Sequence, residues 1–233
     1  METMDLIIKA ATEFYEELRQ DQNGRYRSWE YCYSSFSEAR TGTIDVDYLS
    51  LQLAFYLASW GMYRGSSFLL QKDYRVHIPV VEELLKSEYD ELYGLEYTKL
   101  YNPQIQELLF RLSNKLKSYY LDVRSSCVER EIKHGISDVL ITKILMGTLG
   151  CVPAYDRYFI EGVKLKGVTT GIYNVRSLQK LADFYKANYD KLEAARSELK
   201  VGKNPYPQMK LLDMGFWKIG FDADTGKGLK VAH

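Results

Sequence analysis

The segment from Ser137 to Leu149 constrains the fold more than any other part of the chain. Its apolar residues recur at helical spacing and cover most of the circumference, so the spacing predicts a helix that is buried on nearly all sides. A capping-type serine opens the segment, and Gly147, Gly150 and Pro153 follow as stop signals. This pattern favours a compact domain of several helices packed around it.

Helical periodicity recurs along the chain, and no segment reads convincingly as a strand or a repeat. We therefore predict an all-α fold, a compact multi-helix domain. It is a single domain over residues 1–220, or alternatively two helical lobes of about 1–120 and 121–220, with a mobile tail over 221–233. Helices are predicted over residues 4–20, 29–36, 48–57, 80–92, 104–133, 137–149, 177–199 and 208–220.

Composition leaves several classes of function open. Hydrophobic content of 46% and charged content of 27% are ordinary for a soluble globular protein. The 20 tyrosines are an excess that suits long amphipathic helices and also suits a surface on which bases stack. The chain has no net charge, but residues 1–60 hold 5 basic and 10 acidic side chains, whereas residues 151–233 hold 14 and 9. A nucleic-acid interface would therefore come mainly from the second half.

The cysteines and histidines do not form a recognisable metal or disulfide pattern. Cys32, Cys127 and Cys151 are odd in number and unclustered, and the 3 histidines are scattered. The sequence therefore predicts a reduced chain with no metal site and no cofactor. No apolar run has the length of a membrane span, and the N-terminus lacks the basic start of a signal peptide. We expect a cytoplasmic protein that makes no membrane contact.

A lone acid, Asp156, follows the buried helix after Pro153. The carboxylate is thus delivered at the start of a new segment, directly after an element that fixes its direction, which is how a catalytic acid is commonly mounted. The alternative is structural, because an aspartate at this position also caps a helix that begins at Arg157. Both roles are compatible with one another.

The segment from residue 133 to residue 159 resembles, over about thirty residues, the helix-hairpin-helix DNA glycosylases. In that family, two helices flank a Gly-hydrophobic-Gly hairpin that grips a DNA phosphate, and a catalytic Asp follows the second helix. Here Gly135, Ile136 and Ser137 stand at the hairpin, and Asp156 stands at the position of the catalytic acid. The resemblance implies a helix-hairpin-helix-like element and cleavage of the bond between base and sugar.

Two departures from the family pattern qualify this resemblance. Ser137 replaces the second hairpin glycine, which makes close backbone approach to a phosphate less assured. Val139 stands where lyase-type members carry a nucleophilic lysine, so the resemblance implies hydrolysis by water without a covalent imine. Further phosphate contacts are predicted from three lysines, Lys143, Lys164 and Lys166.

The stretch after residue 58 predicts the walls of a base pocket. Gly61 and Gly65 would lie on one face of a continuing helix, where another helix or a flat ligand can approach closely. Arg64 needs a carboxylate, a helix end or an anionic ligand as its partner. The residues predicted to line the pocket are Trp60, Met62, Tyr63, Arg64 and Tyr155.

We therefore expect a monomeric, monofunctional DNA glycosylase-like enzyme that hydrolyses the N-glycosidic bond of a damaged or modified base in DNA. Two alternatives from other classes stay open. One is a helical DNA- or protein-binding module that lacks catalysis. The other is a helical interaction protein of a phage or of antiphage defence.

Overall fold

The computed structural model describes residues 3–127, 135–202 and 204–226, which form a mostly helical fold. A two-residue antiparallel pair, β1 (Lys200–Val201) and β2 (Asn204–Pro205), accompanies the helices, so the predicted all-α class is confirmed apart from this pair. The α-helices are α1 (Thr3–Gln20), α2 (Ser28–Ala39), α3 (Val46–Ser59), α4 (Ile78–Leu84), α5 (Pro103–Cys127), α6 (Asp138–Thr148), α7 (Arg157–Leu165), α8 (Val175–Ala187), α9 (Tyr189–Glu198) and α10 (Gln208–Asp224). Short 3₁₀ helices connect them: η1 (Arg25–Arg27), η2 (Phe68–Gln71), η3 (Tyr74–His77), η4 (Ser87–Leu92) and η5 (Tyr97–Tyr101).

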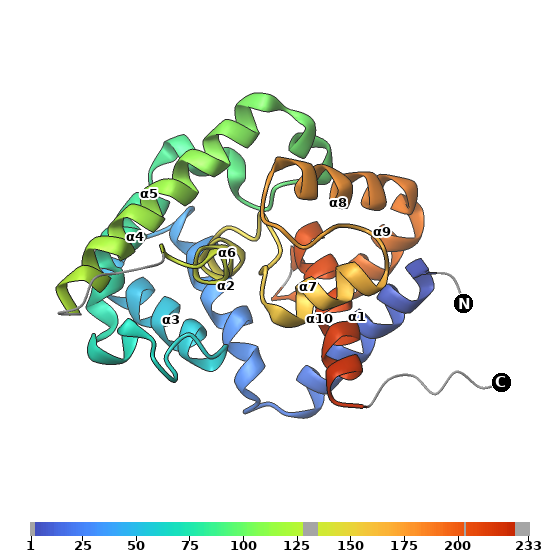
Figure 1. Ribbon diagram of the computed structural model, residues 1–233, viewed down its shortest axis with the longest axis horizontal. Coiled ribbons are helices and arrows are strands. Elements are labelled where there is room, and N and C mark those ends of the chain that lie inside the picture. Colours follow the sequence, from blue (N-terminus) through green and yellow to red (C-terminus); the bar gives the residue numbers. More distant parts are fainter. Residues whose placement is uncertain (1–2, 128–134, 203, 227–233) are drawn as a thin grey trace.

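Helix α6 lies near the centre of the molecule, where Figure 1 shows it end-on with the other helices arranged around it. Every residue from Leu140 to Thr148 is buried, and α2, α3 and α5 pack against the helix. Ser137 caps it, because the serine Oγ accepts a hydrogen bond from the amide of Val139 at 3.0 Å. The predicted buried helix and its cap are both confirmed.

The first and last helices pack together, and glycines set how closely. Figure 1 shows α1, α7 and α10 side by side, which joins the start of the chain to its end. A Cβ atom on Gly162 of α7 would lie 2.0 Å from the carbonyl oxygen of Phe216 in α10. A Cβ atom on Gly220 would lie equally close to the carbonyl oxygen of Tyr158, at 2.0 Å. The backbones of α7 and α10 therefore meet where only glycine leaves room.

The prediction that Gly61 and Gly65 lie on one face of a continuing helix is wrong. Helix α3 ends at Ser59, and Gly61 and Gly65 have φ angles of +79° and +59°. Both glycines therefore form turns in an irregular loop, because this left-handed conformation is costly for other residues. The close helix approach that the pair was expected to allow occurs instead between α7 and α10.

Several predicted boundaries also differ. Asn174 and not Ser177 caps α8, and the expected helix over 177–199 is divided in two at Asn188. Helix α4 ends at Leu84 and is followed by η4, and α10 continues to Asp224, into the expected tail. Residues 227–233 of that tail and residues 128–134 before the predicted hairpin lie outside the described residues. The helix-hairpin-helix-like element as a whole is therefore still a prediction.

Candidate functional site

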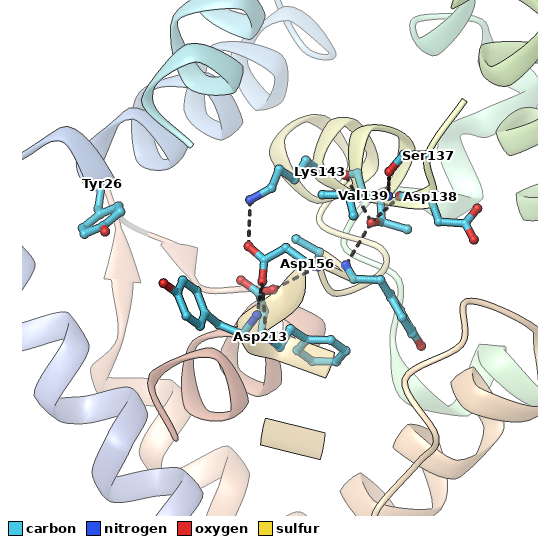
Figure 2. Close-up of polar contacts among 12 residues, drawn as sticks. Tyr26, Ser137, Asp138, Val139, Lys143, Asp156 and Asp213 are labelled. Atoms are coloured by element: carbon cyan, nitrogen blue, oxygen red, sulfur yellow. Dashed lines mark hydrogen bonds and ion pairs between the residues drawn. The ribbon is translucent and has the colours of Figure 1, made fainter. Parts of the chain in front are cut away.

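Asp156 is the N-cap residue of α7, and it is held in place both by the helix that follows it and by the loop that precedes it. Its Oδ1 atom accepts hydrogen bonds from the amides of Tyr158 and Phe159, each at 3.1 Å (Figure 2). The loop that leads to it is buried and is tied by two further amides. The amide of Ala154 donates to Asp213 Oδ1 at 2.9 Å, and that of Tyr155 donates to Thr142 Oγ1 at 2.9 Å. The acid is thus rigidly mounted, and the capping role is confirmed.

The other carboxylate oxygen of Asp156 is held by Lys143 of α6. The Lys143 Nζ atom lies 2.8 Å from Asp156 Oδ2, and the two side chains are 3% and 13% exposed. Lys143 was predicted to contact a DNA phosphate, but its ammonium lies in the interior, where a surface phosphate does not reach. In this structure its partner is the candidate catalytic acid, which remains slightly accessible.

A second buried ion pair lies beside the first. Lys210 Nζ lies 3.0 Å from Asp213 Oδ2, and both side chains are almost fully buried. The ammonium groups of Lys143 and Lys210 lie 5.0 and 5.3 Å from the ring centroid of Trp60, within cation–π range. Trp60 therefore packs against two cations. Its buried Nε1 has no hydrogen-bond partner among the described residues.

Aromatic side chains of intermediate exposure surround this cluster. Tyr26 lies 4.8 Å from Trp60, and Tyr158 packs edge-on against Trp217 at 5.4 Å. Each tyrosine carries an arginine guanidinium over its ring, Arg25 at 4.6 Å and Arg157 at 4.9 Å. In Figure 2 the Lys143–Asp156 pair lies between Tyr26 on one side and Ser137 on the other.

The predicted phosphate-binding turn lies beside part of the predicted base pocket. Gly135, Ile136 and Ser137 line a cavity of about 370 Å³ together with Met62 and Arg64. Arg64 is exposed there and has no ion pair among the described residues. The structure therefore brings the two stretches to one cavity, at the N-terminal end of α6.

The negative charge of Asp138 also lies at this end of α6. The Oδ1 atom of Asp138 lies 2.6 Å from Lys117 Nζ, and this ion pair offsets the repulsion between Asp138 and an anion bound in the cavity. Leu140 lines the cavity, and Lys143 lies about one helical turn further along α6. The cavity and the ion pairs are thus connected through consecutive turns of one buried helix.

The remaining predicted site residues lie elsewhere. The hydroxyl of Tyr63 forms a hydrogen bond of 2.7 Å with His77 Nε2. Tyr155 is buried, and its hydroxyl lies 2.9 Å from Ser177 Oγ. Lys164 and Lys166 lie at the C-terminal end of α7, so roughly 12 Å of helix separates Lys164 from Asp156. Neither lysine joins the cluster around Asp156.

Sequence reasoning missed four of the residues around Asp156: Tyr26, Tyr158, Lys210 and Asp213. The last two carried a usable signal, because a Lys and an Asp three residues apart interrupt the otherwise apolar run from Met209 to Trp217. The two tyrosines carried none beyond their residue type. They are brought to the cluster by η1 and α7, which are distant in sequence.

Comparison of the chain with protein-family models, with curated proteins and with solved structures finds no match. Within the described ranges, no three His, Cys, Asp or Glu side chains gather in the way that holding a metal ion requires. None of the described helices combines the length and apolar content needed to span a bilayer.

Proposed function

We propose that this protein is a monofunctional DNA glycosylase-like enzyme that hydrolyses the N-glycosidic bond of a damaged or modified base, with Asp156 as its catalytic carboxylate. The observation that carries the proposal is the mounting of this acid. One oxygen is fixed by two backbone amides, the other by a buried ammonium, and part of the side chain remains accessible. Such a carboxylate loses little free energy to reorganisation when a cation forms beside it.

The reaction requires a fixed negative charge because breaking the bond between base and sugar leaves a cation-like sugar. In the proposed reaction, water adds to the anomeric carbon, the base departs with the bonding electrons and takes a proton from solvent, and a hydroxyl remains on the sugar; the proton that Asp156 takes up then returns to solvent. Asp156 stabilises the developing positive charge and accepts the proton of the attacking water. Lys143 acts as a positioning residue, because it determines where Asp156 Oδ2 points.

The aromatic surroundings suit the substrate. An enzyme that acts on a base in DNA turns the nucleotide out of the duplex into a pocket with stacking walls. Tyr158 lies two residues after Asp156, Tyr26 packs on Trp60 beside Lys143, and both rings are part-exposed. Arg25 places a cation over the Tyr26 ring, and Arg157, which pairs with Asp224, lies over the Tyr158 ring. Stacked rings with neighbouring guanidinium groups favour single nucleotides and their phosphates.

The direct test needs a double variant. Asp156→Asn alone leaves the buried ammonium of Lys143 without its anion, which destabilises the fold whatever the function. We expect Asp156→Asn/Lys143→Met to release no base from duplex oligonucleotides that each carry one modified base, scored as alkali-labile abasic sites. Lys143→Met alone also removes one partner of the pair, but Asp156 is the more exposed of the two and keeps its two capping amides, so this variant should retain measurable activity per molecule shown to be folded by circular dichroism. Equal base release by wild type and the double variant would remove Asp156 from catalysis.

Substrate binding is tested separately. Tyr26→Ala should weaken the binding of an oligonucleotide that carries an abasic-site analogue by about 10-fold or more, because each stacked base contributes roughly 1–3 kcal/mol. Tyr31→Ala is the matched control, since Tyr31 is a solvent-accessible tyrosine of the neighbouring helix α2. Equal weakening by both variants would argue against a specific role for Tyr26.

The second candidate is a helical DNA-binding module without catalysis. The observation that favours it is that both oxygens of Asp156 already have partners that serve the fold. This function predicts salt-dependent binding of DNA by the wild type and no abasic product from any modified substrate. It also predicts that Asp156→Asn/Lys143→Met binds DNA as the wild type does.

A further inference from the structure

Helices α2 and α3 present an apolar stripe to solvent on the side away from the core. Tyr48, Leu51 and Phe55 occupy positions i, i+3 and i+7 of α3 and are 49%, 47% and 52% exposed. Tyr31 of α2 is 45% exposed beside them. Large apolar side chains at this spacing are usually buried against another element, so the stripe has the pattern of an interface.

The stripe borders a groove between the two helices. Its volume is about 310 Å³, and its lining combines three aromatic side chains with two serines. A groove lined by aromatic and small side chains fits the apolar face of a helix, whose side chains enter it at intervals of three and four residues. The lining residues are Tyr31, Ser34, Ser35, Glu38, Tyr48, Gln52 and Phe55.

We propose that this α2–α3 groove binds an amphipathic helix of a partner protein that carries Lys or Arg beside its apolar face. The stripe from Tyr48 to Phe55 is roughly 10 Å long, which matches about two turns of such a helix. The inference is independent of the function proposed for Asp156, because no residue of the groove belongs to that cluster.

The charge of the side chains around the α2–α3 groove determines which partner helix the groove favours. Glu38 lines the groove, is exposed and has no ion pair among the described residues. Asp45 lies exposed at the start of α3 and also has no ion pair among the described residues, whereas Arg27 and Arg75 are paired with Glu30 and Asp47. The groove is therefore acidic, which favours a basic helix and disfavours the phosphates of a nucleic acid.

The probe for the test is a fluorescent Leu–Lys amphipathic peptide of about 15 residues, long enough to form a helix on binding. A Leu–Glu peptide with the same apolar face is the charge control. We expect the Leu–Lys peptide to bind the wild type at least about tenfold more tightly than the Leu–Glu peptide does. We expect Glu38→Lys to reverse this preference, which a general attraction between apolar surfaces does not explain.

Variants of exposed side chains test the site without disturbing the core. Phe55→Ala should weaken binding of the Leu–Lys peptide by about tenfold or more, because aromatic anchors dominate such interfaces. Ile172→Ala, in the loop before α8, is the matched control because Ile172 is 60% exposed. Three results would overturn the proposal: equal peptide binding by the Phe55 variant, direct binding of labelled single-stranded DNA that Phe55→Ala weakens, or self-association of the protein through this groove in sedimentation.

Discussion

At the scale of single residues, two buried ion pairs share one aromatic ring. Lys143–Asp156 and Lys210–Asp213 bring four ionisable groups into the interior around Trp60. Removing charges from water costs several kcal/mol each, and the cost is offset only while each charge keeps its partner. A single substitution in either pair therefore leaves an unpaired buried charge, whereas removal of both charges does not.

The Lys210–Asp213 pair gives a stability prediction. Lys210→Met should lower the free energy of unfolding by about 3–5 kcal/mol, since Asp213 then remains buried without a counter-ion. Lys210→Met/Asp213→Asn should lower it by less, because the asparagine oxygen still accepts the hydrogen bond from Ala154 N. Urea denaturation measures both, and a double variant less stable than the single one would contradict the argument.

His77 gives a prediction about pH. Its ring is fully buried between two tyrosine hydroxyls, with Nε2 2.7 Å from Tyr63 and Nδ1 2.5 Å from Tyr120. Burial lowers the pKa of His77 to about 4, below its usual value near 6.5. Between these two values the unfolded chain binds a proton that the folded chain does not bind, so acidification favours unfolding.

The His77 contribution is measurable as a difference between variants. As pH falls from 7 to 5, the wild type should lose roughly 2 kcal/mol of unfolding free energy through this group. His77→Gln, which does not titrate, should lack that part of the loss. The comparison is made by urea denaturation at both pH values. An identical loss in the two proteins would show that His77 is not the titrating group.

At the scale of elements, the contact between α7 and α10 depends on the absence of side chains. Gly162→Ala should lower the free energy of unfolding by about 1–3 kcal/mol or more, because the added methyl group overlaps the Phe216 carbonyl oxygen and forces the helices apart. Gly135→Ala is the control, since a Cβ atom there meets nothing within 4 Å. Thermal unfolding measures both, and equal midpoints would contradict the close approach.

Sequence patterns predicted these elements where the determining interactions are local. Ser137 and Asp156 cap the helices that they were expected to begin, because a cap forms between residues two or three positions apart. Ser177 was wrongly predicted as a cap, since Asn174 competes for that position and the serine hydroxyl bonds Tyr155 instead. Local pattern alone did not decide between two such neighbours.

The candidate site was predictable only in part, because its contacts join distant segments. Asp156 was identified from its place after a buried helix, but its partner Lys143 was assigned to a phosphate. Nothing local indicates that Trp60 lies between Lys143 and Lys210, which come from helices far apart in the chain. Such contacts are determined by how the helices pack, and helical periodicity reports only which face is buried.

The first and last helices, α1 and α10, pack against each other and complete the core. Ile7 of α1 packs directly against the backbone of α10 at Gly215, where a side chain would leave no room for it. Beside this contact, the ring of Trp217 packs edge-on against that of Phe14, with the ring centroids 5.4 Å apart. Helix α10 also carries Lys210 and Asp213, so the environment of Asp156 is incomplete without the last helix. Native packing around the candidate site therefore requires nearly the whole chain.

This dependence predicts the behaviour of a shortened chain. A chain that ends at Pro207 lacks α10 and exposes the faces of α1 and α7 that it covers, so we expect no cooperative thermal transition. A synthetic peptide of residues 208–226, added in excess, should restore part of the transition, because ligands of the folded state shift the unfolding equilibrium. The same peptide with Gly220→Leu should not restore it, since that side chain would overlap the backbone of α7 at Tyr158. A cooperative transition in the shortened chain alone would mean that α10 is an addition to an already stable domain, and Asp156 would then be positioned without Asp213.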